Sequence, residues 1–127
     1  ALIVEDEIFV ALDLERILIA AGYQVAAIAA DSASAIEAAP ACSFAFVDIN
    51  LGDGPTGPAI AQRIAEDYGV KVVFVTANPT QIGACDAALG YIRKPFSESA
   101  ILAAAAHASD DLDAANDDFV RLGSRIG

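Results

Sequence analysis

Phe44-Ala45-Phe46-Val47-Asp48 is the stretch that decides the fold of this chain. Its four apolar residues follow one another without a polar interruption, and such runs are typical of strands buried on both faces in a parallel sheet. A carboxylate at the carboxyl end of such a strand lies at the rim where open α/β sheets carry their ligand crevice. Asp48 is therefore the first candidate for a functional residue.

Three other strand-like runs also end in polar residues. They are Leu2-Ile3-Val4 before Glu5-Asp6-Glu7, Val72-Val73-Phe74-Val75 before Thr76-Ala77, and Gly90-Tyr91-Ile92-Arg93 before Lys94-Pro95-Phe96. Because the carboxyl ends of parallel strands meet at one edge of a sheet, we expect these acids, the hydroxyl and the ammonium to converge there. The sequence thus predicts a single site.

Strand signals alternate with helix signals five times, which predicts an α/β domain with a five-stranded parallel sheet and helices on both faces. We expect strands at 1–5, 23–29, 43–48, 70–76 and 90–93. We expect helices at 7–21 and 32–40, from 58 onward, at 78–89, and from 97 onward. Gly22 is suited to a left-handed helix end and Ser97 to an N-cap. The 78–89 helix is the weakest, since it carries Pro79 and Gly83.

The composition bounds the class of protein. A chain of 127 residues with 56% hydrophobic residues is one folded domain rather than a disordered chain. No stretch reaches the roughly 18 apolar residues of a membrane span, and no secretory signal is evident. Cys42 and Cys85 lie far apart, which indicates reduced thiols. We therefore expect a cytoplasmic protein with no membrane association and, in the absence of any Met, a trimmed or processed start.

The charge is strongly acidic, with 18 acidic residues against 7 basic ones and a net charge of −11. This balance argues against nucleic acid as a direct ligand, because phosphate contacts need clustered Lys and Arg. Five aspartates crowd between Asp110 and Asp118 and are best read as a solvated helix end or tail. We expect the folded domain to cover 1–112 and residues 113–127 to form a C-terminal helix extension or tail.

The convergent residues fit one kind of chemistry. Glu5, Asp6 and Asp48 would repel one another unless a cation compensates, and Mg²⁺ prefers such oxygen ligands. Lys94 supplies a compact positive charge and Thr76 a hydroxyl donor. Phosphoryl transfer needs this combination of charge neutralisation and in-line positioning. Asp48 would then be the nucleophile that attacks phosphorus and forms an acyl phosphate.

These motifs make the chain resemble the receiver domain of two-component response regulators, over about residues 1–112. The resemblance implies the flavodoxin-like (βα)5 fold with Asp48 as the phosphoacceptor. It implies that Mg²⁺ is bound directly by Asp6, by Glu5 through water, by Asp48, and by the backbone carbonyl of Asn50. It also implies a cis bond between Lys94 and Pro95.

The resemblance further implies a signalling switch rather than an enzyme with a separate substrate. A histidine kinase or a histidine phosphotransfer protein would phosphorylate Asp48. The phosphoryl group would then attract Thr76, and Tyr91, at the aromatic switch position, would move inward. The face formed by the 78–89 segment, the strand 90–93 and the helix after it would change shape. That face could bind a downstream protein or a second copy.

The loop after the acceptor reads Asn50-Leu51-Gly52-Asp53-Gly54-Pro55-Thr56-Gly57 and departs from the common receiver pattern. Gly52 stands where many receivers have proline, and the helix-start glycine comes one residue late. This loop sequence resembles that of single-domain and stress-response receivers that work with unorthodox sensor kinases.

Three other functions compete with this interpretation. A phosphohydrolase of the haloacid dehalogenase type also uses a strand-end Asp, but it needs an acid two residues later, where this chain has Asn50. A flavodoxin-like protein would have to bind the phosphate of its cofactor beside the acids after the first strand, and these acids would repel it. A receiver-like docking module that is never phosphorylated would not need the intact acids, Thr76 and Lys94.

Overall fold

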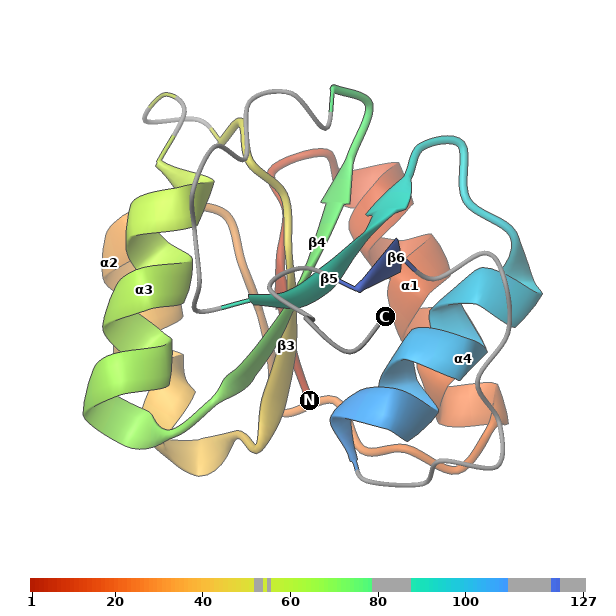
Figure 1. The fold of residues 1–127 in the computed structure, drawn as a ribbon, viewed down its shortest axis with the longest axis horizontal. Coiled ribbons are helices and arrows are strands. Elements are labelled where there is room, and N and C mark those ends of the chain that lie inside the picture. Colours follow the sequence, from red (N-terminus) through yellow and green to blue (C-terminus); the bar gives the residue numbers. More distant parts are fainter. Residues whose placement is uncertain (52–53, 55, 79–87, 110–119, 122–127) are drawn as a thin grey trace.

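The computed structural model describes residues 1–51, 54, 56–78, 88–109 and 120–121. Strands and helices alternate along the chain apart from the interval 79–87, which the structure does not describe (Figure 1). The strands are β1 (Leu2–Val4), β2 (Ala27–Ala29), β3 (Phe44–Val47), β4 (Lys71–Thr76), β5 (Ala88–Arg93) and β6 (Val120–Arg121). The helices are α1 (Ile8–Ala20), α2 (Ser32–Ala38), the short 3₁₀ helix η1 (Ala39–Ala41), α3 (Gly57–Tyr68) and α4 (Glu98–Ala108).

The strands form one sheet in the order β2-β1-β3-β4-β5-β6. The first five are parallel, and β6 is added antiparallel to β5. Helices α2 and α3 cover one face of the sheet, whereas α1 and α4 cover the other (Figure 1). The predicted five-stranded parallel sheet with helices on both faces is confirmed.

The core has two layers because successive strand residues point to opposite faces of the sheet. In β3, Ala45 and Val47 pack in the layer under α2 and α3, whereas Phe44 and Phe46 pack in the layer under α1 and α4. All four are buried. Burial on both faces explains why β3 reads as an uninterrupted apolar run.

Two predicted helix ends are confirmed. Gly22 follows α1 with a φ of 95°, a backbone conformation that disfavours residues with a Cβ atom. Ser97 is the N-cap of α4, and its side chain accepts a hydrogen bond from the backbone N–H of Ala100 at 3.1 Å. Both ends therefore follow from local chemistry that the sequence carries.

Two predicted elements differ in extent. Strand β2 is shorter than 23–29, because the N–H of Tyr23 is bonded to the carbonyl of Leu18 and so closes the end of α1. Ala88 and Leu89, predicted as helix, belong to β5, where pairing with β4 draws them into the sheet. Most of the predicted 78–89 helix, residues 79–87, lies outside the described residues.

The chain after α4 contributes β6, which the sequence pattern did not predict. Helix α4 ends at Ala108. The assignment of residues 113–127 as a helix extension or tail stays a prediction. The domain boundary at residue 112 stays a prediction. Within the described ranges, no helix has both the length and the apolar character needed to span a membrane.

Candidate functional site

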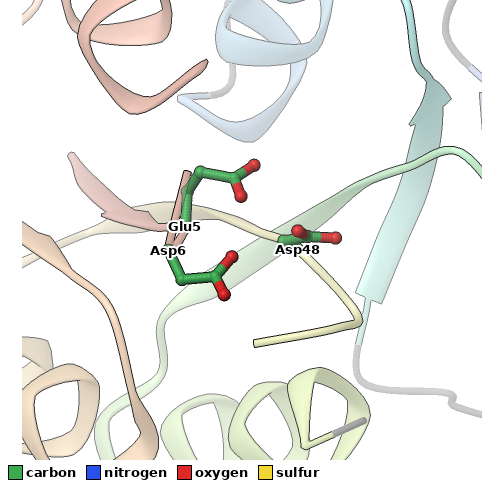
Figure 2. A group of neighbouring side chains, drawn as sticks. All are labelled: Glu5, Asp6 and Asp48. Atoms are coloured by element: carbon green, nitrogen blue, oxygen red, sulfur yellow. The ribbon is translucent and has the colours of Figure 1, made fainter. Parts of the chain in front are cut away.

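Three carboxylates meet at the carboxyl edge of the sheet (Figure 2). Glu5 and Asp6 follow β1, and Asp48 follows β3. One oxygen from each lies within 4.8 Å of the others. Glu5 and Asp48 are buried, while Asp6 is exposed. The predicted acidic cluster is therefore present.

The register of the sheet places these acids. Val4 of β1 pairs with Val47 of β3, so the residues that follow them are neighbours across the two strands. The backbone N–H of Asp48 extends this ladder by donating to the carbonyl of Val4 at 2.9 Å. Because both acids leave adjacent parallel strands at the same level, their proximity is built into the backbone.

Lys94 completes the cluster from the end of β5. Its Nζ donates to Glu5 Oε1 at 2.8 Å and to Asp48 Oδ2 at 3.3 Å. Its backbone N–H donates to the carbonyl of Thr76 at 2.8 Å, which ties the lysine to the end of β4. The Lys94–Pro95 peptide bond is cis, as expected. In this structure the shorter contact of Lys94 is with Glu5, not with Asp48.

The electrostatics of the cluster follow from burial. Loss of solvent raises the pKa of Glu5 from its ordinary 4.5 to about 7. The ammonium of Lys94 opposes this rise, and the neighbouring Asp48 adds to it. Burial works to lower the pKa of Lys94, yet contact with Glu5 and Asp48 raises it overall. Lys94 is therefore charged at neutral pH, while Glu5 holds a proton part of the time.

Glu5 should make stability depend on pH when no divalent ion is present. The folded chain keeps a proton on Glu5 that the unfolded chain releases near pH 4.5. The free energy of unfolding should therefore fall as the pH rises from about 4.5 through about 7. Urea unfolding at pH 5, 6, 7 and 8 in a chelator measures this slope. In Glu5→Gln this part of the slope should vanish; an equal slope in both proteins would refute the assignment.

The other predicted residues occupy different places around the cluster. Thr76 is buried at the end of β4, and its Oγ1 accepts a hydrogen bond from the N–H of Asn78 at 3.0 Å. The backbone N–H of Asn50 donates to Asp48 Oδ1 at 3.4 Å. Tyr91 is half-buried in β5 and packs against the core layer under α3. Thr76 and Tyr91 are thus in neighbouring strands, but no contact of either with Asp48 is described.

Gly57 is a structural requirement that the sequence pattern alone did not reveal. It begins α3 directly beside the chain that follows β3, and its N–H donates to the carbonyl of Ile49 at 3.0 Å. A Cβ atom on Gly57 would lie 2.6 Å from Ile49 Cα and closest of all to the Asp48 carbonyl. Only glycine allows this approach, so Gly57 helps to fix the backbone of Asp48.

A cavity of about 470 Å³ opens beside the cluster. Its lining residues are Asp6, Glu7, Asp48, Asn50, Leu51, Ala77 and Lys94. A second cavity of about 490 Å³ adjoins it and shares Ala77 and Lys94 with it. The second cavity is apolar and is also lined by Phe9, Val10, Asp13, Pro95 and Phe96.

The apolar surface beside the second cavity was also missed from sequence. Three large residues at the start of α1 are exposed: Ile8 by 57%, Phe9 by 83% and Leu12 by 45%. Isolated exposed apolar residues are ordinary, but three within two helical turns form a patch. The sequence carried one signal for this surface, which is that these three residues do not fall on the buried side of the helix. We call Ile8, Phe9 and Leu12 the α1 patch.

The donor set suits a hard divalent cation. Glu5, Asp6 and Asp48 offer carboxylate oxygens close enough to share one ion, and Asn50 lines the same cavity. Mg²⁺ prefers oxygen ligands and keeps several waters, for which the exposed Asp6 leaves access. The residues present therefore fit Mg²⁺.

Comparison with known proteins agrees with this fold. A family model described as the response regulator receiver domain matches residues 1–106. The phyllosphere-induced regulator PhyR of Methylorubrum extorquens is 30% identical over 107 residues, which are 80% of this chain and 40% of that protein. The chain therefore spans well under half the length of this curated relative.

Two solved structures place the similarity in three dimensions. The receiver domain of PhyR from Erythrobacter litoralis has a TM-score of 0.77 and 30% identity, covering 86% of this chain and 88% of that one. A response regulator protein from Burkholderia pseudomallei has a TM-score of 0.71 and 26% identity, covering 86% and 68%. The latter was solved with a phosphorylated aspartic acid, a calcium ion and citrate. This chain belongs to the response regulator receiver domain family.

Proposed function

We propose that this chain is a phosphoacceptor switch of a two-component system, in which Asp48 accepts a phosphoryl group in a Mg²⁺-dependent reaction. The observation that carries the proposal is the contact of Lys94 Nζ with both Glu5 and Asp48 beside an open cavity. A buried carboxylate, a charged ammonium and an acidic ligand set are the parts that phosphoryl transfer to a carboxylate needs.

The proposed step transfers a phosphoryl group from a phosphohistidine of the donor to Asp48. A carboxylate oxygen of Asp48 forms the new O–P bond, while the N–P bond of a phosphohistidine donor breaks. The bonding electrons return to the ring nitrogen of the donor. Lys94 offers its charge at 3.3 Å from Asp48, where negative charge on the phosphoryl oxygens must be offset. The proposed product is an aspartyl phosphate on Asp48.

Mg²⁺ held by Glu5, Asp6, Asp48 and the carbonyl of Asn50 would neutralise part of the charge on the phosphoryl oxygens. We expect Mg²⁺ to raise the melting temperature, since it binds the folded acids and relieves their repulsion. At ten times its Kd the gain is about 1.4 kcal/mol. Thermal unfolding across a Mg²⁺ titration measures it.

Two variants provide the control for this titration. Asp6→Asn should remove most of the Mg²⁺-dependent gain, because Asp6 is the proposed direct ligand. Asp67→Asn removes the same charge from the exposed side of α3, where Asp67 pairs with Arg63 at 2.9 Å, and should retain the gain. A native melting temperature that does not respond to Mg²⁺ would overturn the metal site.

The direct test of the proposed function uses a small-molecule donor. The native chain is incubated with acetyl phosphate and Mg²⁺, and the modified residue is located by mass spectrometry. We expect one phosphoryl group on Asp48, and none when the Mg²⁺ is removed by a chelator. A modification at another residue, or no modification, would overturn the assignment.

The α1 patch supports a protein as the physiological donor. Lys94 and Ala77 line both cavities, so a protein docked on the patch and the apolar cavity reaches the edge of the Asp48 site. A small-molecule donor would not need this apolar surface. The proposed donor is a histidine kinase or histidine phosphotransfer protein that operates in the cytoplasm.

The proposed output runs through Thr76 and Tyr91. These residues lie on adjacent strands, and the N–H of Lys94 is bonded to the carbonyl of Thr76. A hydroxyl drawn toward a phosphoryl group would therefore act on β5 directly. The changed face would comprise residues 78–96 and α4, and it would bind a downstream protein or a second copy.

Thr76→Ala should leave Asp48 reactive but separate it from β5. Addition of beryllofluoride, a phosphoryl mimic, to the native chain should change hydrogen exchange across 88–96, where the folded backbone responds to the switch. In Thr76→Ala the mimic should still bind while this change is lost. An identical exchange response in both proteins would show that the signal takes another route.

The other interpretations receive no support from a specific observation. The position two residues after Asp48 is an amide, Asn50, rather than the acid that a phosphohydrolase of the haloacid dehalogenase type needs. The close contact of Lys94 with Asp48 argues against a docking module that has lost phosphorylation. Receiver domains are signalling modules rather than enzymes that turn over a separate substrate.

A further inference from the structure

Strand β6 covers the edge of β5, on the side away from the phosphoacceptor site. The sheet order places β5 between β4, which carries Thr76, and β6 (Figure 1). Without β6, β5 would be an edge strand, and such edges present backbone groups that pair readily with other strands. We propose that β6 is a built-in cover of the β5 edge, and that its pairing stabilises the unphosphorylated state of the switch.

A row of paired residues joins β6 to the acids. Val47, the residue before Asp48, pairs with Phe74 of β4, which pairs with Tyr91 of β5, which pairs with Val120 of β6. At its other end the row continues from Val47 to Val4, the residue before Glu5. The row therefore begins beside the acids and ends at β6.

Packing makes part of this row respond as a unit. Val4, Val47 and Phe74 belong to one buried core layer, and Tyr91 packs against that layer. Close-packed residues transmit a displacement because the interior has little free volume. A shift of Tyr91 therefore changes the backbone to which Val120 is paired. The proposed movement of Tyr91 in the switch thus depends on whether β6 is paired with β5.

The pairing of β5 with β6 is shorter than its pairing with β4, which indicates that the pairing with β6 opens first. β5 pairs with β4 at five register positions but with β6 at only two, Gly90 with Arg121 and Tyr91 with Val120. Short pairings are lost more easily than long ones, so β6 opens while β5 stays in the sheet. If phosphorylation favours opening, opening must favour phosphorylation by the same factor.

Release of β6 would uncover the β5 edge for another strand. Extended peptides bind exposed sheet edges through backbone hydrogen bonds, so a partner segment of this kind fits the position that β6 vacates. This inference rests on the proposed function, because it couples β6 to the state of Asp48. Beyond that function, the inference assigns to β6 a part in the switch, as the strand that covers the edge of β5.

Proline substitutions in β6 test the cover, with the full chain and with beryllofluoride plus Mg²⁺ as the probe. In a two-residue antiparallel pairing only one residue donates across the ladder, so Val120→Pro or Arg121→Pro removes that donor. Val120→Ala and Arg121→Ala keep the N–H and serve as matched controls. Hydrogen exchange at Gly90 and Tyr91 reports whether β6 is paired.

We expect one of the two proline variants to exchange faster than the native chain at Gly90 or Tyr91. The same variant should bind beryllofluoride more tightly than the native chain, by about fivefold or more. The alanine controls should bind within about twofold of the native chain. Reciprocally, beryllofluoride should speed exchange at the same amides in the native chain. Unchanged exchange in both proline variants would show that β6 does not cover the edge.

Faster exchange with unchanged or weaker binding would also overturn the proposal, because β6 would then not oppose the phosphorylated state. These failures differ from a failure of the proposed function. In the latter case acetyl phosphate leaves Asp48 unmodified and the native chain does not bind beryllofluoride, and the coupling falls with it. A native chain that is phosphorylated on Asp48 while its proline variants show no gain rejects the cover alone.

Discussion

Replacement of Asp48 by Asn should abolish phosphoryl uptake from acetyl phosphate while the domain stays folded. The amide has nearly the same volume but is a much weaker nucleophile, so uptake should fall on the order of a hundredfold or more. Lys94 keeps its 2.8 Å contact with Glu5, and one charge leaves a crowded site. Without Mg²⁺ the variant should therefore be at least as stable as the native chain. Intact-mass spectrometry measures uptake, and urea unfolding measures stability.

Asp67→Asn is the matched control for this substitution. It makes the same change of an acid to an amide at an exposed position of α3. Its phosphoryl uptake should equal that of the native chain. If the Asp48→Asn protein is phosphorylated at the native rate, another residue accepts the phosphoryl group.

Gly57→Ala should cause a large loss of stability for a single added methyl group. The new Cβ would collide with the backbone of Asp48 and Ile49, and backbone atoms cannot move aside as a flexible side chain can. Overpacking of this kind costs about 1–3 kcal/mol, and we expect the upper end of that range. The free energy of unfolding in urea measures the loss. Because relief of the collision displaces Asp48, the remaining folded protein should also take up phosphoryl groups more slowly.

Ala59→Ser provides the comparison in the same turn of α3. Ala59 is exposed, so the substitution should change the free energy of unfolding by no more than about 0.5 kcal/mol. A Gly57→Ala protein as stable as the native chain would show that the loop after β3 adapts without cost. It would also remove the argument that Gly57 holds Asp48 in place.

The architecture and the membership of the acidic cluster could be predicted from the sequence alone. The run Phe44–Val47 predicted a strand buried on both faces with Asp48 at the rim of the sheet, and the four residues of the run are buried in β3. The same reasoning located Glu5, Asp6 and Lys94, because each follows a strand of the same parallel sheet. Local signals such as Gly22 and Ser97 set helix ends through backbone conformation and hydrogen bonding.

The extent of β2 and β5 could not be read from local patterns. Tyr23 has strand propensity, but its N–H serves the end of α1 instead. Ala88 and Leu89 have helical propensity, but pairing with β4 places them in the sheet. Tertiary hydrogen bonds override local preference at such positions, since a backbone group needs a partner wherever the chain runs.

The contacts among the site residues, and the surface around them, depend on tertiary packing and could not be predicted from the sequence. The sequence places Lys94 near both acids, but distances in three dimensions show its shorter contact with Glu5. The need for glycine at position 57 comes from the approach of α3 to the chain after β3, which no local pattern records. The pairing of β6 with β5 likewise joins segments about thirty residues apart through backbone groups that every residue carries. Local sequence specifies which groups are available, whereas the packing of distant segments decides which of them meet.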